Sequence, residues 1–142
     1  MSHELTSRLG YLLKHAQDKL REMNNIALAH HGIDGRELAV LIVLATGEPA
    51  SQQEAAARLG VDRTTMVALL DVLEHKGLVA RTPDVHDRRR NVVELTAGGR
   101  TTLHAAVRTT DEVEREFLAP LSLRAADQFR TALRALVVTD ED

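Results

Sequence analysis

The sequence contains no cysteine and no tryptophan, and its aromatic side chains are limited to two Phe and one Tyr. The absence of cysteine excludes disulfide bonds and thiol-based redox sensing. A core without large rings has to be built from Leu, Val, Ile and Ala, which favours helices over a β-sandwich or barrel. No apolar run approaches the roughly 20 residues needed to cross a bilayer, and no signal-peptide pattern is visible. We therefore expect a mainly helical, cytoplasmic protein that does not associate with membranes.

Signatures of catalysis and of cofactor binding are also missing. The sequence has no P-loop, no nucleophile elbow, no zinc-protease helix motif and no Gly-rich dinucleotide turn. Its seven histidines suggest one metal cluster, which comprises His30, His31, Glu37 and His104. Structural zinc sites use closely spaced ligands, often thiolates, and this set has neither. We expect no enzyme activity, no metal and no cofactor.

The formal charge of -3 conceals an uneven distribution along the chain. Between Arg58 and Arg90, seven Arg or Lys residues face five Asp or Glu residues, so this window carries +2 and the remainder -5. Much of the negative charge lies at 111–116 and at Asp140–Asp142. A basic patch on an acidic body can bind phosphate locally, while the body discourages indiscriminate association.

Apolar periodicity predicts two helices in the first third of the chain. The first follows a helical period from residue 5 to residue 27, about six turns, and ends at 30–32 (His-His-Gly). Its single apolar stripe needs a partner. The second begins at a capping box formed by Asp34 and Glu37 and ends at Gly47.

The segment from Ser51 to Gly77 predicts two short helices separated by a tight turn. Ser51 and Glu54 form another capping box, and Gly60 supplies the left-handed residue that ends the first helix. After two linking residues, a second helix carries its apolar residues at helical spacing: Met66, Leu69, Leu70 and Leu73. Two such helices form a helix-turn-helix, whose second helix fits the major groove of DNA.

A basic hairpin and two further helices complete the predicted order. The two strands are 78–81 and 91–95, joined by a charged tip at 82–90. Thr96 is the expected N-cap of a long helix, which Pro120 ends, and Ser122 caps the last helix. The chain therefore has four helices, a two-stranded hairpin and two more helices.

Three short motifs in this region carry a family resemblance. They are Asp84-Val-His-Asp-Arg-Arg89 in the tip, Leu95-Thr96 with Gly99 after it, and Asp71-Val-Leu-Glu-His-Lys-Gly-Leu-Val79. They are similar to the wing, the following helix start and the recognition-helix ending of the MarR family of bacterial transcriptional regulators. Helix order and length agree over essentially the whole chain. The resemblance implies a winged helix-turn-helix of six helices and a two-stranded wing, acting as a repressor.

The resemblance also implies how the chain is organised. The whole chain, 1–142, is one unit in which 34–99 is the DNA-binding lobe, while 1–31 and 100–142 are dimerisation helices. A twofold homodimer would bind double-stranded DNA at a pseudo-palindromic operator, with half-sites about one helical turn apart. Candidate interface positions are Leu5, Leu9, Leu12, Leu121, Phe129, Leu133 and Leu136. The alternative is that these side chains fill the core of a monomer.

Residues near the start of the second helix of a helix-turn-helix read bases. Here they are Arg63, Thr64, Thr65 and, one turn later, Ala68. Arg63 is suited to a bidentate contact with guanine, and the threonines offer hydroxyls for bases or phosphates and methyls that suit thymine. Gln52 and Gln53 begin the preceding helix, where backbone N–H groups favour phosphate.

The wing supplies the other candidate DNA contacts. They are His86, Asp87, Arg88, Arg89 and Arg90. By the resemblance, Arg89 enters a minor groove, while Asp87 orients a wing arginine through a salt bridge, since its carboxylate would repel phosphate. The family often has Arg where this chain has His86 and Ala68. His86 weakens the ionic anchoring of the wing, whereas Ala68 removes a potential DNA contact.

The family often binds small anionic or phenolic effectors between the dimer helices and the DNA-binding lobe. Polar candidates for such a cleft are Tyr11, His15, His31, Arg36 and Arg108. A ligand bound there would favour a dimer whose recognition helices no longer match the groove spacing. The competing hypothesis for the whole protein is a winged-helix module that binds another protein and does not read DNA.

Overall fold

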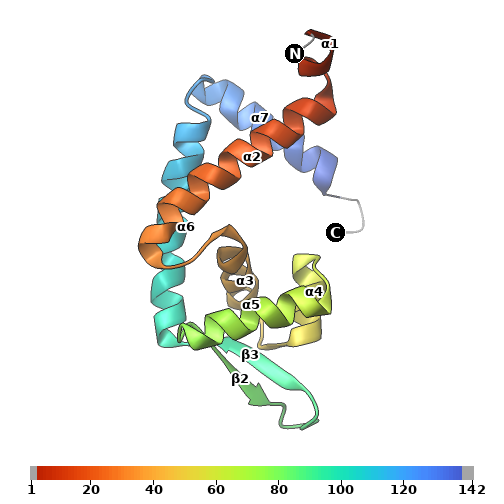
Figure 1. The fold of residues 1–142 in the computed structure, drawn as a ribbon, viewed down its shortest axis with the longest axis vertical. Coiled ribbons are helices and arrows are strands. Elements are labelled where there is room, and N and C mark those ends of the chain that lie inside the picture. The colour runs from red at the N-terminus through yellow and green to blue at the C-terminus, as the bar shows by residue number, and fades with distance from the viewer. Residues whose placement is uncertain (1–2, 139–142) are drawn as a thin grey trace.

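The computed structural model describes residues 3–138, so the acidic residues Asp140–Asp142 lie outside the described part. The elements in chain order are α1 (His3–Thr6), α2 (Leu9–Leu28), the 3₁₀ helix η1 (Ala29–His31), α3 (Gly35–Ala45), β1 (Ala50–Ser51), α4 (Gln52–Leu59), α5 (Arg63–His75), β2 (Val79–Pro83), β3 (Asn91–Leu95), α6 (Ala97–Phe117) and α7 (Leu123–Val137). Figure 1 shows α3, α4, α5 and the strands forming a lobe below an arch of α2, α6 and α7. Among the described helices, none has the length and apolarity of a membrane span.

The predicted helix starts are present, because each depends on a side chain three residues from the backbone group that it caps. Asp34 and Glu37 form the complete capping box, and Thr96 and Ser122 accept the N–H groups of Gly99 and Ala125. At the start of α4, Ser51 Oγ accepts the Glu54 N–H at 3.1 Å. Among the described contacts only this half of the second predicted box forms, since the Glu54 carboxylate instead binds Arg90.

Two details of the predicted element order are wrong. The N-terminal helix is not continuous: α1 ends at Thr6 and α2 begins at Leu9. The hydroxyls of Thr6 and Ser7 donate to backbone carbonyls three residues earlier, a local alternative to helical hydrogen bonding, and Arg8 is extended. The β2–β3 hairpin also does not stand alone, because the two-residue strand β1 pairs antiparallel with β3 and extends it to a three-stranded sheet of order β1-β3-β2.

The core lies within the lobe and under the lower half of α6. Its largest fully buried side chains are Leu28, Leu41, Met66, Leu70, Leu73, Val40 and Val93. The predicted apolar face of α5 is buried throughout, and Leu103 and Ala106 of α6 join the same cluster. The core is therefore aliphatic, as the composition predicted, and it fixes α5 with its opposite face outward.

The start of α6 packs directly on the base of the wing. Thr96 donates its hydroxyl to the Gly77 carbonyl at 2.6 Å and its N–H to the Leu78 carbonyl at 3.1 Å. Gly99 is buried against the same carbonyl, so closely that a Cβ on Gly99 would overlap the Leu78 oxygen. Only glycine fits this junction between the lobe and the long helix.

The outer faces of the terminal helices are exposed. Of the predicted interface residues, the exposed ones are Leu5, Leu9, Leu12, Leu121, Phe129 and Leu136. Leu133 is half-buried and, with Phe129, lines a small apolar hollow against Leu20 of α2 and Phe117 of α6. None of the residues of α7 is buried. Much of the apolar surface of the arch is thus exposed within the part of the chain that the structure describes.

Candidate nucleic-acid interface

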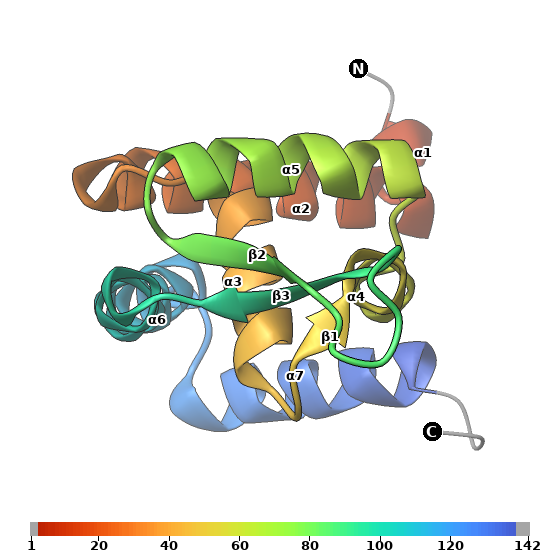
Figure 2. The same ribbon diagram turned by 90° about the horizontal axis from the view of Figure 1, so that it is seen from below.

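Helix α5 lies on the outer face of the lobe, beside the strands of the wing. Figure 2 shows α5 and the β2–β3 hairpin together on the side of the molecule opposite the arch. Gly60 adopts a left-handed conformation (φ 75°), which ends α4 and allows α5 to start after two residues. Arg63, Thr64 and Ala68 are exposed, whereas Thr65 is half-buried. The predicted base-reading residues therefore share one accessible end of the helix.

Asp62 caps this helix. Its carboxylate accepts the Thr65 N–H at 2.7 Å. This backbone hydrogen bond is the main cause that lowers the Asp62 pKa below its ordinary value of 3.8, because it stabilises the charged form. The negative charge also suits the positive end of the helix dipole. This cap was not predicted, although Asp two residues after a left-handed glycine is a recognisable N-cap signal.

Asp62→Asn should make the protein less sensitive to acid. Because the Asp62 pKa is lowered in the folded state, the carboxylate stabilises the fold fully above pH 3.8 and loses this effect as the pH falls through the folded-state value. Asn caps equally well without titrating. Melting temperatures measured from neutral pH to about pH 2.5 should therefore fall less for Asp62→Asn than for the parent below about pH 4. Parallel curves would contradict this role.

The tip of the wing is ordered by its own aspartates. Asp84 Oδ1 accepts the His86 N–H at 2.9 Å, and Asp87 Oδ1 accepts the Arg89 N–H at 3.1 Å. The same Asp87 oxygen lies 3.4 Å from Arg89 Nε, and the Arg89 side chain is 93% exposed. Asp87 therefore pairs with a wing arginine, while its role in DNA binding stays a prediction. Its contact is with Nε of a guanidinium that is otherwise exposed to solvent.

The three consecutive arginines have different surroundings. Arg88 and Arg89 are exposed at the tip, whereas Arg90 Nη2 lies 2.6 Å from Glu54 Oε1 on α4. The Arg90 carbonyl also accepts the Asp84 N–H at 2.8 Å and closes the tip. Arg90 therefore fastens the wing to the first helix of the helix-turn-helix. Arg88 and Arg89 are the wing arginines available to an external ligand.

Arg81 of β2 is a residue that the sequence analysis missed. Its guanidinium, only 15% exposed, binds Asp71 and Glu74 of α5 and donates to Gln52 Oε1 of α4 at 2.9 Å. The hydrogen bond to Asp71 is the main cause that raises the Arg81 pKa above its ordinary value. Arg81 thus connects the wing to both helices of the helix-turn-helix. Because Arg81 donates to the amide oxygen of Gln52, the amide N–H₂ group of Gln52 remains as the hydrogen-bond donor of that side chain.

Comparison with known proteins identifies this arrangement. A MarR family model matches residues 31–90. The transcriptional regulator HosA of Escherichia coli is 36% identical over 93 residues, covering 65% of this chain and 69% of HosA. The repressor CouR bound to a 23-mer DNA duplex superposes with a TM-score of 0.89, at 32% identity and 96% coverage of both chains.

The chain belongs to the MarR family.

Other relatives agree with this assignment. The transcriptional repressor MprA of Escherichia coli K12 is 30% identical over 131 residues, which cover 91% of this chain and 74% of MprA. CouR from Rhodococcus jostii RHA1 has also been solved with p-coumaroyl-CoA, and that structure superposes with a TM-score of 0.79 at 29% identity, covering 95% of each chain. The chain is therefore a winged-helix transcriptional regulator of the MarR family.

The candidate effector residues of this MarR-family chain lie on several elements. Tyr11 stacks on His15 within α2, with ring centroids 4.1 Å apart. His31 Nε2 is hydrogen-bonded to Thr109 Oγ1 of α6 at 2.7 Å, and Arg36 is exposed in the first turn of α3. Arg108 lies on α6 and borders a hollow of about 460 Å³. Among the five candidates, the described contacts join only Tyr11 to His15.

The hollow beside Arg108 lies between α3 and α6. It is lined by the apolar side chains of Ile42, Ala45, Leu103 and Val107 and by the polar side chains of Thr46, His104 and Arg108. The suggested metal cluster of the sequence analysis does not assemble: residues 3–138 contain no group of three or more His, Asp or Glu side chains placed for a metal ion. Glu37 instead binds Lys76, with 2.6 Å between Oε2 and Nζ.

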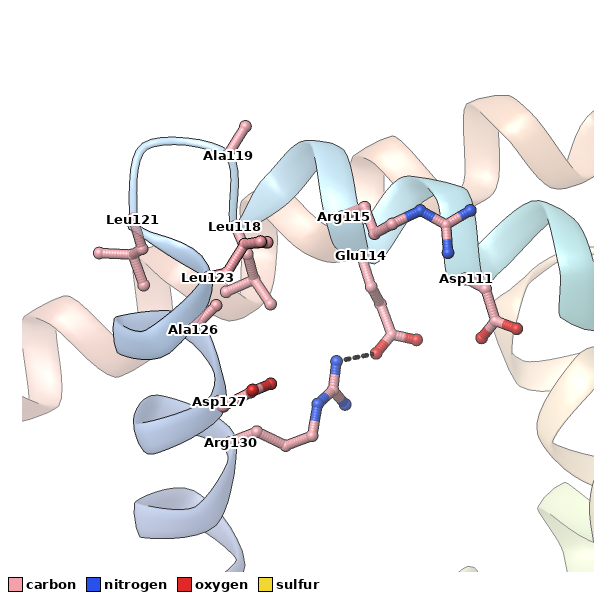
Figure 3. A pocket seen from close by; sticks show the side chains of 10 residues that line it. All are labelled: Asp111, Glu114, Arg115, Leu118, Ala119, Leu121, Leu123, Ala126, Asp127 and Arg130. Carbon is pink, nitrogen blue, oxygen red and sulfur yellow. Dashed lines mark ion pairs between the residues drawn. The ribbon is translucent and has the colours of Figure 1, made fainter.

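A larger hollow of about 600 Å³ opens between the end of α6 and α7. Figure 3 shows Leu118, Leu121 and Leu123 at the turn between the two helices, with Glu114 and Arg130 paired across the hollow (2.9 Å). It belongs to the arch, on the side of the molecule away from the wing (Figure 1). Leu121, one of the predicted interface residues, is therefore part of a concave surface that a second chain could fill.

Proposed function

We propose that this MarR-family regulator binds a pseudo-palindromic operator as a homodimer and represses transcription by occupying the promoter. The observation that carries the proposal is the common face formed by the first turn of α5 and the tip of the wing (Figure 2). On it, Arg63 and Arg89 are exposed, and the buried apolar face of α5 holds that helix against the core. The similarity to DNA-bound CouR supports the same mode of binding.

The residues of this face would have different roles in DNA binding. Arg63, Thr64, Thr65 and Ala68 would face base edges in the major groove, and Gln52 and Gln53 would meet phosphates at the start of α4. Arg89, with Arg88 beside it, would enter a minor groove. Asp87 and Arg90 would hold the wing in shape, and His86 would lie at its edge. In this arrangement 34–99 reads DNA without catalysing a reaction.

Dimerisation would use the segments 1–31 and 100–142. Leu9 and Leu12 are 67% and 50% exposed, and Leu136 is 77% exposed. Covering such side chains stabilises association by about 25 cal/mol for each Å² of apolar surface removed from water. The concave surface at Leu121 and the exposed leucines of the N-terminal helices would contact the second chain. A twofold dimer would place two copies of α5 in successive major grooves.

A small anionic or phenolic effector would act through the hollow between α3 and α6. That hollow combines apolar lining residues with Arg108 and His104, which suits a ligand with an apolar body and an anionic group. CouR, solved with p-coumaroyl-CoA, is a relative with a ligand of that chemistry. Binding would favour a dimer geometry with a different separation of the two recognition helices.

Arg63→Ala and Arg89→Ala should affect DNA binding in different ways. Loss of Arg63 should relax base preference at one position of each half-site, by about 1–3 kcal/mol if the contact is bidentate. Loss of Arg89 should weaken binding to most sequences and reduce the slope of log K against log[salt] by about 1 for each wing. Fluorescence anisotropy on matched and mismatched duplexes at several salt concentrations measures both. Equal effects on base preference would contradict the division of roles.

Unbiased selection of DNA by the purified protein at near-physiological salt tests the function itself. Recovery of a palindrome with turn-spaced half-sites would support a dimeric operator-binding protein. If a folded dimer recovers nothing, the selection is repeated after unfolding and refolding in the absence of small molecules. Continued failure would replace the proposal by the alternative, a winged-helix module that binds protein.

A further inference from the structure

The outward face of α5 carries a line of side chains that end in methyl groups. Thr64, Ala68 and Val72 follow one another at intervals of four residues, so they lie on one face of the helix. All three are exposed, and Val72 is 46% exposed although it is aliphatic. The opposite face of the helix is buried in the core. An exposed Val on the outward face of α5, in the last third of the helix, is a feature that the core does not explain.

The same face is poor in side chains that read bases by hydrogen bonding. Bidentate readout of guanine or adenine requires Arg, Lys, Asn or Gln. From Thr64 to His75 the helix contains none of these four residue types. Asp71, the acidic neighbour of Val72, is bound by Arg81 of the wing. Bidentate recognition by α5 is therefore confined to Arg63. Thr64 and Thr65 add single hydroxyls, and Thr64, Ala68 and Val72 present methyl groups along one line of the face.

We infer that α5 reads the C5-methyl groups of thymines, through Ala68 and Val72 together with the methyl of Thr64. The inference rests on the proposed operator binding and specifies which base feature the recognition helix detects. The major groove presents this methyl only on thymine, and apolar side chains contact it favourably. Because these side chains are short, the helix backbone can approach the base edges closely. Arg63 and the exposed wing arginines supply the positive charge that brings the duplex to this face.

The deciding experiment replaces thymine by deoxyuridine, which lacks only the C5-methyl group, in the operator recovered by selection. Each half-site thymine is substituted in turn, and binding of the full-length protein is measured at fixed salt. A buried methyl contributes about 0.8 kcal/mol, so we expect about fourfold weaker binding for each methyl contacted. Deoxyuridine outside the protected sequence should have no effect. At the same position, 5-methylcytosine should bind more tightly than cytosine when both are paired with guanine.

Two protein variants assign the effect to α5. Ala68→Gly deletes the central methyl, and Val72→Thr keeps the branched shape while replacing one methyl by a hydroxyl. In each variant the deoxyuridine penalty should shrink to less than twofold at the thymine that the altered residue contacts, and remain elsewhere. Melting temperatures verify that both variants are folded, and comparison within each variant removes any general loss of affinity.

The outcomes separate this inference from the proposal on which it rests. If no sequence is bound above non-specific DNA, both are overturned. If a specific operator is recovered but deoxyuridine changes its affinity by less than twofold at every thymine, operator binding stands and methyl readout is overturned. A deoxyuridine penalty that is identical in the parent and both variants would also overturn it, because the methyls would then be read by another element.

Discussion

Gly99→Ala should destabilise the protein by about 3 kcal/mol, the upper part of the range for overpacking a rigid site. The added Cβ would overlap the Leu78 carbonyl oxygen, and backbone cannot move aside as the end of a side chain can. That carbonyl also accepts the Thr96 N–H that connects the wing to α6. Urea unfolding of parent and variant at equal protein concentration measures the change, since dimerisation makes stability concentration-dependent.

Gly98→Ala provides a matched control in the adjacent position. A Cβ there would lie 3.6 Å from the Gly77 carbonyl oxygen, an ordinary van der Waals contact. Because alanine loses less backbone entropy than glycine on entering a helix, this variant should be as stable as the parent or more stable by up to about 1 kcal/mol. Equal destabilisation by both substitutions would show that the beginning of α6 does not pack on the wing as described.

Lys76→Met should destabilise the lobe by about 2–3 kcal/mol. Lys76 Nζ lies 2.6 Å from a carboxylate oxygen of Glu37, whose side chain is only 7% exposed, and also donates to the Gly32 carbonyl at 2.8 Å. Removing the lysine leaves a buried charge without its partner, which typically costs about 3–5 kcal/mol. The expected value is lower because the Lys76 side chain is 35% exposed. Chemical denaturation monitored by circular dichroism checks it.

A second substitution separates the loss of this ion pair from the loss of packing. Glu37→Gln removes the buried charge while keeping an oxygen that can accept the Asp34 N–H. The double variant with Glu37→Gln and Lys76→Met should therefore be more stable than Lys76→Met alone. Lys14→Met removes an exposed ion pair with Asp18 and should change stability by about 0.5 kcal/mol or less. A double variant no more stable than Lys76→Met would show that the Glu37 charge is not responsible.

The sequence predicted the parts of the fold that depend on near neighbours. The caps at Asp34, Thr96 and Ser122 were predictable because each partner lies three residues away. The left-handed turn at Gly60 was predictable because glycine adopts that conformation readily. The family motifs then supplied the winged architecture around these local features.

The Asp62 cap was missed although its partner lies three residues away, whereas the other missed features depend on residues that are distant in sequence. Arg81 binds partners 7 to 29 residues away, and Lys76 binds Glu37 across 39 residues. Strand β1 is only two residues long and exists because β3 pairs with it. No local pattern predicts which of several charged residues will meet in space. For the same reason the roles of Arg88, Arg89 and Arg90 became distinct only when Glu54 was placed beside one of them.

The attachments of the wing have a consequence for how DNA can be released. Arg81 holds the hairpin to α4 and α5, and Arg90 holds its tip to α4. These contacts connect the wing, α4 and α5 into one unit, and α6 of the arch is hydrogen-bonded to this unit at the base of the wing. A ligand that binds in the arch therefore does not have to change the conformation of either DNA-binding lobe. A change in the separation of the two lobes of the dimer is enough, because both lobes then no longer fit one face of the double helix at once.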